Sequence, residues 1–419
     1  MRWLIVEDAL RDRKGHWFEY LGTFVRELRA LGDDVTVLVD RAAEPFLVEQ
    51  LQAQPVLPAS IWHRMNDGSG PLRRYLRVPV HAWRTYRAIK KYVRRNEKFD
   101  VIFVPTVLVH HLLGWVLLVK RALKQTSTRV ILFFPNTPIQ LDLKTNEPSW
   151  LPAPTAKLFC RLIRSLRDEV KHGRVILGAE TEPMREALMR MTGVPFTYFP
   201  HPVTTGANTE TLKTENLKSE NQISNASISK FQLSAFNPSS TITMASYGSA
   251  RYEKGSDLLV AAVDEFCRRY PDSRVRFVLQ SVDGDANFWE HLKGNPKVRL
   301  IPDYFADGEY AQRLQETDVL LLPYRRSSYA LRVSRVVIEA MVHGIPVVAT
   351  RGTTLAEQAE KFGAAVLCED ENVESLVAAM HDLEQRFGEL KRRVELQKQK
   401  AREHFSIVFF RELLMKTQS

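Results

Sequence analysis

Cysteine is scarce in this chain of 419 residues, which contains only three. Cys160, Cys267 and Cys368 are widely separated, so they form neither a metal-binding spacing nor a disulfide framework. Proteins of oxidising compartments often carry such a framework. The scarcity therefore predicts a protein of a reducing compartment.

Long apolar runs are also missing. The first apolar stretch is short and acidic residues follow it at once, unlike a secretory signal. The longest run, residues 101–119, is interrupted by Pro105, His110 and His111, so it is not expected to cross a membrane. We expect a cytoplasmic protein, with peripheral binding to the inner face of a membrane as an alternative.

The sequence shows no zinc-ligand spacing, no RNP-type aromatic motif and no recognition-helix pattern, which are signs of nucleic-acid binding. What the chain does have is a surplus of positive charge, +10 in total. A surplus of this kind favours anionic partners such as nucleotides, nucleic acid or anionic lipid. Since the recognition motifs are missing, we expect no nucleic-acid partner.

Residues 204–240 differ in composition from the rest of the chain. They are rich in threonine, asparagine, serine, glutamate and lysine and contain few apolar residues. Such a segment cannot bury a core of its own. We predict a disordered linker or insertion there, with no chemistry assigned to it.

Residues 1–203 alternate apolar strands with amphipathic helices. A strand at 3–6 is followed by a polar loop, a helix that ends near Gly32, and a second strand at 35–39. This βαβ order requires a crossover and therefore a parallel sheet. Further strands are expected at 101–104, 130–134, 175–178 and 196–199.

The same alternation starts again over residues 241–395. The remaining residues, 396–419, are expected to end in a helix at 403–416 that could pack back on the first domain. The fold class is therefore α/β, with two Rossmann-like doubly wound domains facing a cleft lined by the carboxyl ends of their strands. In the second domain, strands are expected at 241–247, 275–280, 298–301, 319–322, 346–350 and 366–368, and helices at 255–270 and 336–343.

Cationic residues follow the strand expected at 241–247. Gly248 would let the chain turn and let a ligand approach the backbone, and Arg251 and Lys254 come next, before Gly255 opens a helix. The N–H groups and dipole of a helix N-terminus favour anions, and arginine can grip a phosphate with its fork. The pattern favours an anion site, and a solvated charged loop is the alternative.

A second polar group follows the strand expected at 319–322. Ser334 is expected to cap an apolar helix, with Arg332 and Arg335 beside its N-terminus, so this end would form a second anion site facing the first. Glu339 lies in that helix among apolar neighbours, and a buried glutamate is rare unless it is paired. An ionised Glu339 could accept hydrogen bonds from the diol of a ribose, and a helix-surface salt bridge is the alternative.

Three segments, GSARYEKGSDLL, DVLLLPY and IEAMVHGIPVVAT, occur in this order in the second domain. With these segments the chain resembles the retaining nucleotide-sugar glycosyltransferases of the GT-B fold, in the family-4 group. The resemblance implies that Arg251 and Lys254 hold the donor diphosphate and act in catalysis, and that Glu339 binds the ribose. It also implies that Arg332, Ser334, Arg335 and Gly248 belong to the donor site.

The resemblance further implies transfer with retention from a UDP- or GDP-sugar to a glycan or lipid-linked acceptor, as in polysaccharide biosynthesis. It implies no metal and no cofactor besides the donor. The family's E-x7-E pattern places its first glutamate at Leu331, so that carboxylate is absent here. Recognition of the donor sugar must then differ, and the stretch YRRSSYALRVS is similar to a variant in which Arg332 and Ser334 contact the diphosphate.

On the acceptor side, the family has a glycine-rich loop after the first strand and a histidine near the strand expected here at 101–104. Gly15 and His16 occupy the loop, and either His110 or His111 could line the pocket. His201 at the end of the domain is a further candidate. For each histidine, the alternative to a role in the site is a side chain on the surface or in the packing between helices.

Residues 72–100 are strongly basic. Arg84, Arg87, Lys91, Arg94 and Lys98 recur along one face of an expected helix whose other face is apolar. A basic amphipathic helix favours an anionic membrane surface, and a solvated helix face is the alternative.

Three other functions are alternatives for this scaffold. A sugar-nucleotide epimerase would need paired carboxylates in the cleft, and only Glu339 is placed for that role. A phosphorylase would need a pyridoxal lysine, for which the sequence has no signature. A non-catalytic nucleotide-sugar-binding protein is compatible with Leu331 at the glutamate position.

Overall fold

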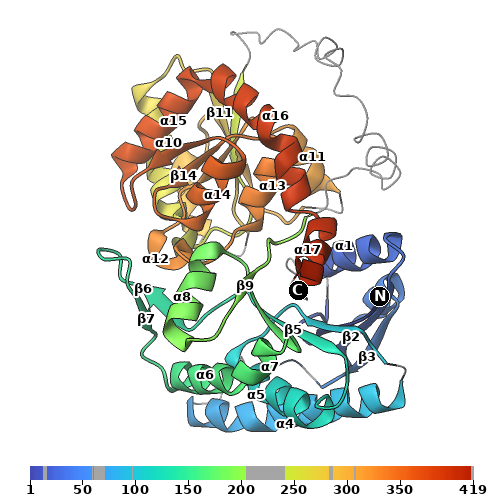
Figure 1. Ribbon diagram of the computed structural model, residues 1–419. Coiled ribbons are helices and arrows are strands. Elements are labelled where there is room, and N and C mark those ends of the chain that lie inside the picture. Colours follow the sequence, from blue (N-terminus) through green and yellow to red (C-terminus); the bar gives the residue numbers. More distant parts are fainter. Residues whose placement is uncertain are drawn as a thin grey trace, which may run out of the picture. The chain divides into compact units, whose positions relative to one another are not determined.

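A computed structural model describes residues 1–12, 17–58, 60, 71–96, 98–203, 241–282, 286–305 and 308–416. The linker predicted at 204–240 lies outside these residues. The chain divides into two compact units, each described by itself (Figure 1). The first unit comprises Met1–Pro202, Leu331–Val333 and Ile407–Ser419, and the second comprises Val203–Ala330 and Ser334–Ser406.

The first unit is built on a parallel sheet of seven strands in the order β3-β2-β1-β4-β5-β8-β9. The central strands are apolar almost throughout, as expected for strands covered on both faces. The strand order reverses between β1 and β4, which is where ligands bind in open α/β sheets. The strands are β1 (Arg2–Glu7), β2 (Asp34–Asp40), β3 (Ala53–Leu57), β4 (Val101–Val104), β5 (Arg129–Phe134), β8 (Val175–Ala179) and β9 (Thr197–Tyr198).

Helices cover both faces of this sheet, and each face has its own apolar core. One core is shared with α4, α5, α6 and α8, and the other with α1, α2 and α17. The elements are α1 (Trp17–Ala30), α2 (Pro45–Leu51), α4 (Pro71–Arg95), α5 (Val109–Leu117), the π-helix η1 (Leu118–Ala122), α6 (Pro154–Ser165), α7 (Arg167–Lys171), α8 (Glu182–Thr192) and α17 (Ile407–Lys416), with an antiparallel hairpin of β6 (Ile139–Leu141) and β7 (Pro148–Trp150).

The C-terminal helix α17 completes the second of these cores. Its Phe410 is fully buried and packs against three other aromatic rings, with centroid distances of 5.1 Å to Phe24, 5.5 Å to Phe103 and 4.6 Å to Phe199. Arg411 of the same helix donates to both carboxylate oxygens of Asp33, at 2.9 and 3.1 Å. The last helix is therefore an integral part of the first unit.

The second unit contains a parallel sheet of six strands in the order β12-β11-β10-β13-β14-β15, again with a reversal, between β10 and β13. The strands are β10 (Ile242–Ser246), β11 (Val275–Gln280), β12 (Val298–Ile301), β13 (Val319–Leu322), β14 (Val347–Thr350) and β15 (Ala365–Cys368). The helices are η2 (Tyr252–Lys254), α10 (Ser256–Arg269), η3 (Ala286–Leu292), α11 (Glu309–Gln315), α12 (Arg326–Tyr329), α13 (Arg335–His343), α14 (Thr354–Phe362), α15 (Val373–Gln385) and α16 (Phe387–His404).

The predicted α/β class with two Rossmann-like domains is confirmed, but several element predictions are wrong. The polar stretch after the strand at 319–322, for which no helix was predicted, contains the single turn α12, which is too short to show a helical period. The expected helix 403–416 is broken, because Phe405 is buried in the second unit and Ile407 in the core of the first. Lys98 lies beyond the end of α4 at Arg95. Among the described helices, none has the length and apolar character needed to traverse a bilayer.

Candidate functional site

The candidate donor site of the second unit starts at two neighbouring strand ends. β10 and β13 pair in parallel, with Met244 opposite Val319 and Ala245 opposite Leu320. Their carboxyl ends therefore meet at the same edge of the sheet, at the reversal of strand order. The loop after β10 carries Gly248 to Gly255, and the loop after β13 leads toward α13.

Gly248 makes the first turn after β10. Its φ of 102° lies in a region that residues with a side chain rarely adopt. Its N–H donates to Gln280 Oε1 at 2.8 Å, and a Cβ placed on Gly248 would lie 3.0 Å from Lys254 Nζ. The ammonium group of Lys254 therefore lies directly over the glycine backbone, where a side chain would displace it.

Gly255 holds this loop against the end of β13. It precedes α10 with φ 66°, and an added Cβ would lie 2.1 Å from the carbonyl oxygen of Pro323. No side chain can be accommodated at that distance, so a glycine is required. The close approach of two backbones places the N-terminus of α10 beside the end of β13.

Arg325 locks the two loops together, and sequence analysis did not single it out. The side chain of Arg325 is only 4% exposed. Its guanidinium donates two hydrogen bonds of 2.8 Å to the carboxylate of Asp257 and one of 2.9 Å to Glu371. It also donates to the carbonyl of Tyr252 and lies 3.5 Å from the centre of that ring. One buried cation thus fixes η2 and the start of α10, which carry the predicted phosphate contacts.

The two predicted diphosphate cations differ in their surroundings. Arg251 is half exposed and pairs with Glu253 at 3.1 Å, an exposed ion pair that holds the side chain only weakly. Lys254 Nζ lies 5.7 Å from the ring centroid of Tyr324. Burial raises the pKa of Tyr324, whose hydroxyl interacts with the side chain of Ser334. Lys254 and Ser334 therefore flank the same tyrosine.

Glu339 is buried in α13 and has a partner on each carboxylate oxygen. Arg335 Nε donates to Oε1 at 2.8 Å, and the hydroxyl of Tyr310 donates to Oε2 at 2.5 Å. Burial and the charge of Glu339 raise the pKa of Tyr310, so the tyrosine stays a donor. Tyr310 was missed in the sequence because it lies in α11, far from the motif. Its ring contacts Tyr247, at a centroid distance of 5.9 Å, just before Gly248.

The structure thus brings five predicted residues to one end of the second unit: Gly248, Lys254, Ser334, Arg335 and Glu339. Ser334 stands at the N-cap of α13, although its side chain makes no capping bond. The site thus offers two cationic side chains and one buried carboxylate, which suits a ligand with phosphoryl and hydroxyl groups.

Arg332 belongs to a three-residue segment, Leu331–Val333, of the first unit. Leu331, at the position of the missing glutamate, is buried in an apolar core of that unit. Its carbonyl accepts a hydrogen bond of 2.6 Å from Thr181 Oγ1. An apolar residue at this position therefore serves packing, and the contact of Arg332 with a diphosphate stays a prediction.

The first unit has a buried polar cluster at the end of β1, where its strand order reverses. Glu7 ends β1 and Asp8 follows it, His81 comes from α4, and His110 and His111 come from α5. Asp8 Oδ2 lies 3.0 Å from His111 Nε2 and 3.2 Å from His81 Nε2. The two predicted histidines are thus joined by three residues that sequence analysis missed. In the sequence, the signal for this cluster was the pair of acidic residues, Glu7 and Asp8, that follows the first apolar run.

The cluster keeps its members in different protonation states. Burial acts against the charge of Asp8, but the charge of His111 and hydrogen bonds from the two imidazoles hold the pKa of Asp8 well below its usual range. Burial also acts against a charged His111, but Asp8 overcomes this and raises the pKa of His111. Burial and the neighbouring imidazoles lower the pKa of His110 to about 2, so it is neutral at pH 7.

Glu7 has a different character from Asp8. Burial and the charge of Asp8 raise the pKa of Glu7 from 4.5 to about 7. Its Oε1 accepts from the N–H of Ala9 at 2.9 Å. A carboxyl group with this pKa can take up or release a proton at neutral pH, which general acid–base chemistry requires.

The ligand atoms of Asp8, His81 and His111 lie within 4.8 Å of one another, a set that could hold a metal ion. Imidazole and carboxylate groups are ordinary zinc ligands. Gly15 and His16, predicted for the acceptor side, lie outside the described residues. His201 has contacts within the first unit: its Nδ1 lies 3.2 Å from Glu180 Oε1, and its ring stacks on Tyr20 at a centroid distance of 4.6 Å. These contacts are those of a packed side chain.

Comparison with known proteins bears on the family and the fold. Residues 241–386, most of the second unit, match the family described as Glycosyl transferases group 1. No curated protein matches the sequence. The expected resemblance to GT-B glycosyltransferases is therefore confirmed.

Many solved structures match this chain, among them three that each cover nearly its whole length. HepE of Anabaena in complex with UDP and glucose is 13% identical with a TM-score of 0.61, covering 100% of this chain and 99% of its own. A glycosyltransferase of Rickettsia africae is 13% identical with a TM-score of 0.63, covering 100% and 97%. Sucrose-phosphate synthase of Thermosynechococcus elongatus is 12% identical with a TM-score of 0.60, covering 99% and 96%. At these identities the likeness shows the fold.

Proposed function

We propose that this protein is a glycosyltransferase that moves a hexose from a nucleotide-sugar donor to a glycan or lipid-linked acceptor. The observation that carries the proposal is that Tyr324, just after β13, lies against both Lys254 of the loop after β10 and Ser334 at the N-cap of α13. The family match over residues 241–386 supports the reaction class. HepE, a protein of similar fold, binds UDP and glucose.

Within this proposal, Arg251 and Lys254 bind the donor diphosphate. Cleavage of the bond between sugar and diphosphate leaves negative charge on the leaving phosphate, and cations fixed at that point lower the barrier. Gly248 lets the phosphate approach the backbone beside Lys254. The contacts of Arg325 keep this loop in position before the donor arrives, so little reorganisation is needed during the reaction.

Glu339 binds the ribose of the donor nucleotide in this scheme. A carboxylate has lone pairs for more than one donor on each oxygen, so the bonds from Arg335 and Tyr310 leave acceptor capacity for a diol. Those bonds also fix the orientation of Glu339. UDP and GDP sugars both supply the required ribose and diphosphate.

We further propose transfer with retention of the anomeric configuration and without a metal ion. Retention is an expectation from the resemblance, in which the leaving phosphate helps to deprotonate the acceptor on the same face of the sugar. A lipid-linked acceptor, as in polysaccharide biosynthesis, would place the protein peripherally at the inner face of a membrane. Anomeric proton couplings of the product and activity after EDTA treatment test these two points.

The first experiment is a thermal-shift screen with UDP-, GDP- and ADP-sugars, since a ligand that binds the native state raises the melting temperature. The donor found in this way is then tested for turnover. Lys254→Ala should lower kcat by about a hundredfold, the effect of losing one preorganised donor. Lys157→Ala, an exposed lysine of α6, is the control. Unchanged turnover in Lys254→Ala would remove the diphosphate assignment.

A non-catalytic nucleotide-sugar-binding protein is the second candidate. The buried Leu331 favours it, because the carboxylate that contacts the sugar in relatives is replaced by a packed apolar side chain. An epimerase is less well supported, since Glu339 is the one predicted carboxylate of the second unit's site. Donor binding without transfer or hydrolysis, over a panel of acceptors, would decide for the non-catalytic protein.

A further inference from the structure

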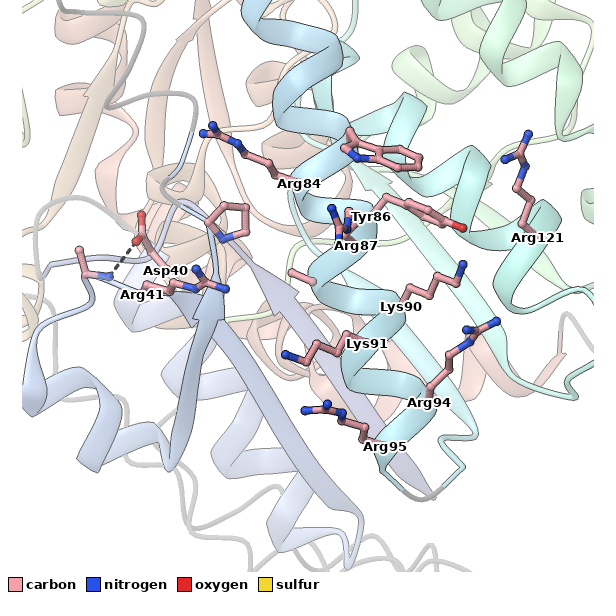
Figure 2. A pocket seen from close by; sticks show the side chains of 14 residues that line it. Asp40, Arg41, Arg84, Tyr86, Arg87, Lys90, Lys91, Arg94, Arg95 and Arg121 are labelled. Carbon is pink, nitrogen blue, oxygen red and sulfur yellow. Dashed lines mark hydrogen bonds between the residues drawn. The ribbon is translucent and has the colours of Figure 1, made fainter.

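One surface of the first unit carries a groove of about 1030 Å³ whose lining is mostly cationic. Helix α4 forms one wall, the chain that follows β2 and β3 forms the other, and η1 contributes one residue (Figure 2). Asp40 is its one carboxylate. The lining includes eight cations: Arg41, Arg84, Arg87, Lys90, Lys91, Arg94, Arg95 and Arg121.

The cations follow from the helical period of α4. Ala82, Tyr86 and Ile89 face inward and are buried in the first unit. The cations lie on the opposite face of the helix, where Arg84, Arg87 and Lys91 are exposed. Arg41 and Arg121 stand on opposite sides of this row, as Figure 2 shows. Residues from three separate parts of the chain thus contribute charge of one sign to one groove.

This charge is not neutralised within the described residues. Asp40 is buried, and its two carboxylate oxygens accept from the N–H groups of Ala42 at 2.8 Å and Ser60 at 3.0 Å. Among the residues that the structure describes, the groove cations form no ion pair with a carboxylate. Arg41 Nε donates to the carbonyl of Val56 at 3.0 Å, and Lys90 Nζ lies 5.3 Å from the ring of Tyr86.

Other exposed arginines of this chain do have acidic partners. Arg351 pairs with Glu369 at 2.8 Å, and Arg386 with Asp382 at 3.1 Å. The eight cations and one carboxylate of the groove leave seven positive charges, against +10 for the whole chain. Most of the surplus charge is therefore concentrated at one place, which indicates an anionic partner.

Exposed apolar side chains on the same helix indicate what carries the anion. Val80 and Trp83 are each 48% exposed, and they lie within the turn of α4 that precedes the first groove cation, Arg84. Trp83 also lines the groove. Tryptophan prefers the interface between water and lipid, and arginine and lysine reach from there to the headgroups. A soluble phosphate would have no use for these apolar groups.

We propose that this groove binds the phosphate headgroups of an anionic membrane, with Trp83 and Val80 in the interfacial layer. The helix lies along the membrane surface, and the groove seats headgroups between α4 and Arg41. The proposal does not depend on the function proposed for the second unit. It extends the membrane contact expected of the helix alone to a surface that includes Arg41 and Arg121.

The test is flotation of the full-length protein with vesicles of phosphatidylcholine alone or mixed with phosphatidylglycerol. We expect binding to the mixed vesicles only, weakened at high salt because exposed charges are screened. The triple variant Arg87→Glu, Lys91→Glu and Arg94→Glu should lose about a hundredfold or more in affinity. The control is Lys157→Glu, Arg161→Glu and Arg392→Glu, exposed cations elsewhere with the same change in net charge.

Two further measurements separate the lipid from other anions. Trp83→Ser should weaken vesicle binding even at high salt, where the electrostatic part is small. Inorganic phosphate should compete no better than chloride at equal ionic strength. Equal binding of the triple variant and its control, or binding to phosphatidylcholine alone, would overturn the proposal. Specific competition by inorganic phosphate would also overturn it, in favour of a soluble phosphate ligand.

Discussion

The guanidinium of Arg325 and the carboxylate of Asp257 form two parallel hydrogen bonds of 2.8 Å each. This fork joins the loop after β13 to the first turn of α10. It lies beside the backbone contact between Gly255 and Pro323, so the candidate phosphate loop is held by a salt bridge and by steric fit. The predicted donor contacts thus depend on residues that need not touch the donor.

Arg325→Lys should destabilise the protein and weaken nucleotide binding. A lysine keeps the charge but cannot form the fork, so at least one hydrogen bond to a charged group, worth roughly 1.5–3 kcal/mol, is lost. Thermal unfolding and titration with UDP measure the two effects. Arg351→Lys is the control, because its pair with Glu369 is exposed and worth little. Equal losses in both variants would show that the fork has no special role.

Gly255→Ala should be much more destabilising than Gly294→Ala. Both glycines have a positive φ, which costs an alanine about 1–2 kcal/mol. Only Gly255 would also place a Cβ 2.1 Å from Pro323 O, whereas nothing lies within 4 Å of a Cβ on Gly294. Denaturant unfolding gives both values. A difference near zero would show that the loop after β10 moves away from β13 without cost.

Tyr310→Phe should raise the KM for the donor by about fivefold while leaving the fold intact. The variant removes the hydroxyl that donates to Glu339, and a hydrogen bond to a charged group contributes roughly 1.5–3 kcal/mol, part of which water can replace. Tyr304→Phe, at an exposed tyrosine, is the control. An unchanged KM in Tyr310→Phe would mean that Glu339 is positioned by Arg335 alone.

Glu339→Gln should weaken donor binding by about tenfold, because the amide accepts weaker hydrogen bonds than the carboxylate. The loss should appear with nucleoside diphosphates and be absent with inorganic diphosphate, which has no ribose. Isothermal titration with both ligands makes the distinction. Equal losses for the two ligands would argue that Glu339 acts on the phosphates or on the fold.

Glu7→Gln should stabilise the protein at pH 8 and have little effect at pH 4. The pKa of Glu7 is raised from 4.5 to about 7, so its neutral form is favoured in the folded state. Its contribution to stability is complete below about 4.5 and is lost as the pH rises through 7, a change on the order of 3 kcal/mol. Melting temperatures at the two pH values, with Glu360→Gln as an exposed control, measure it. A pH-independent effect would contradict the assignment.

Elements with a strong apolar pattern could be predicted from the sequence. The strands β4, β11, β12 and β13 have the bounds that the sequence predicts. β4 and β13 are apolar and buried throughout, as strands covered on both faces are, whereas β11 and β12 each include one exposed arginine and were recognised from their flanking apolar residues. β3 was missed, since it is an edge strand that contains Pro55 and has an exposed middle. α12 was missed because one turn shows no period.

The donor-side residues could be predicted because they follow strand ends in one continuous motif. Arg325 and Tyr310 could not be assigned, since their roles come from contacts with residues 68 and 29 positions away. The cluster of Asp8, His81 and His111 likewise joins α4, α5 and the end of β1, which only the sheet topology brings together. Sequence spacing carries no information about such contacts.

The packing of α17 in the first unit limits how this protein can be recombined. A chimaera that takes residues 1–202 from one relative and the remainder from another would pair Phe24 and Phe103 with a foreign Phe410 equivalent. A chimaera that preserves this packing must take all three segments of the first unit, residues 1–202, 331–333 and 407–419, from the same relative.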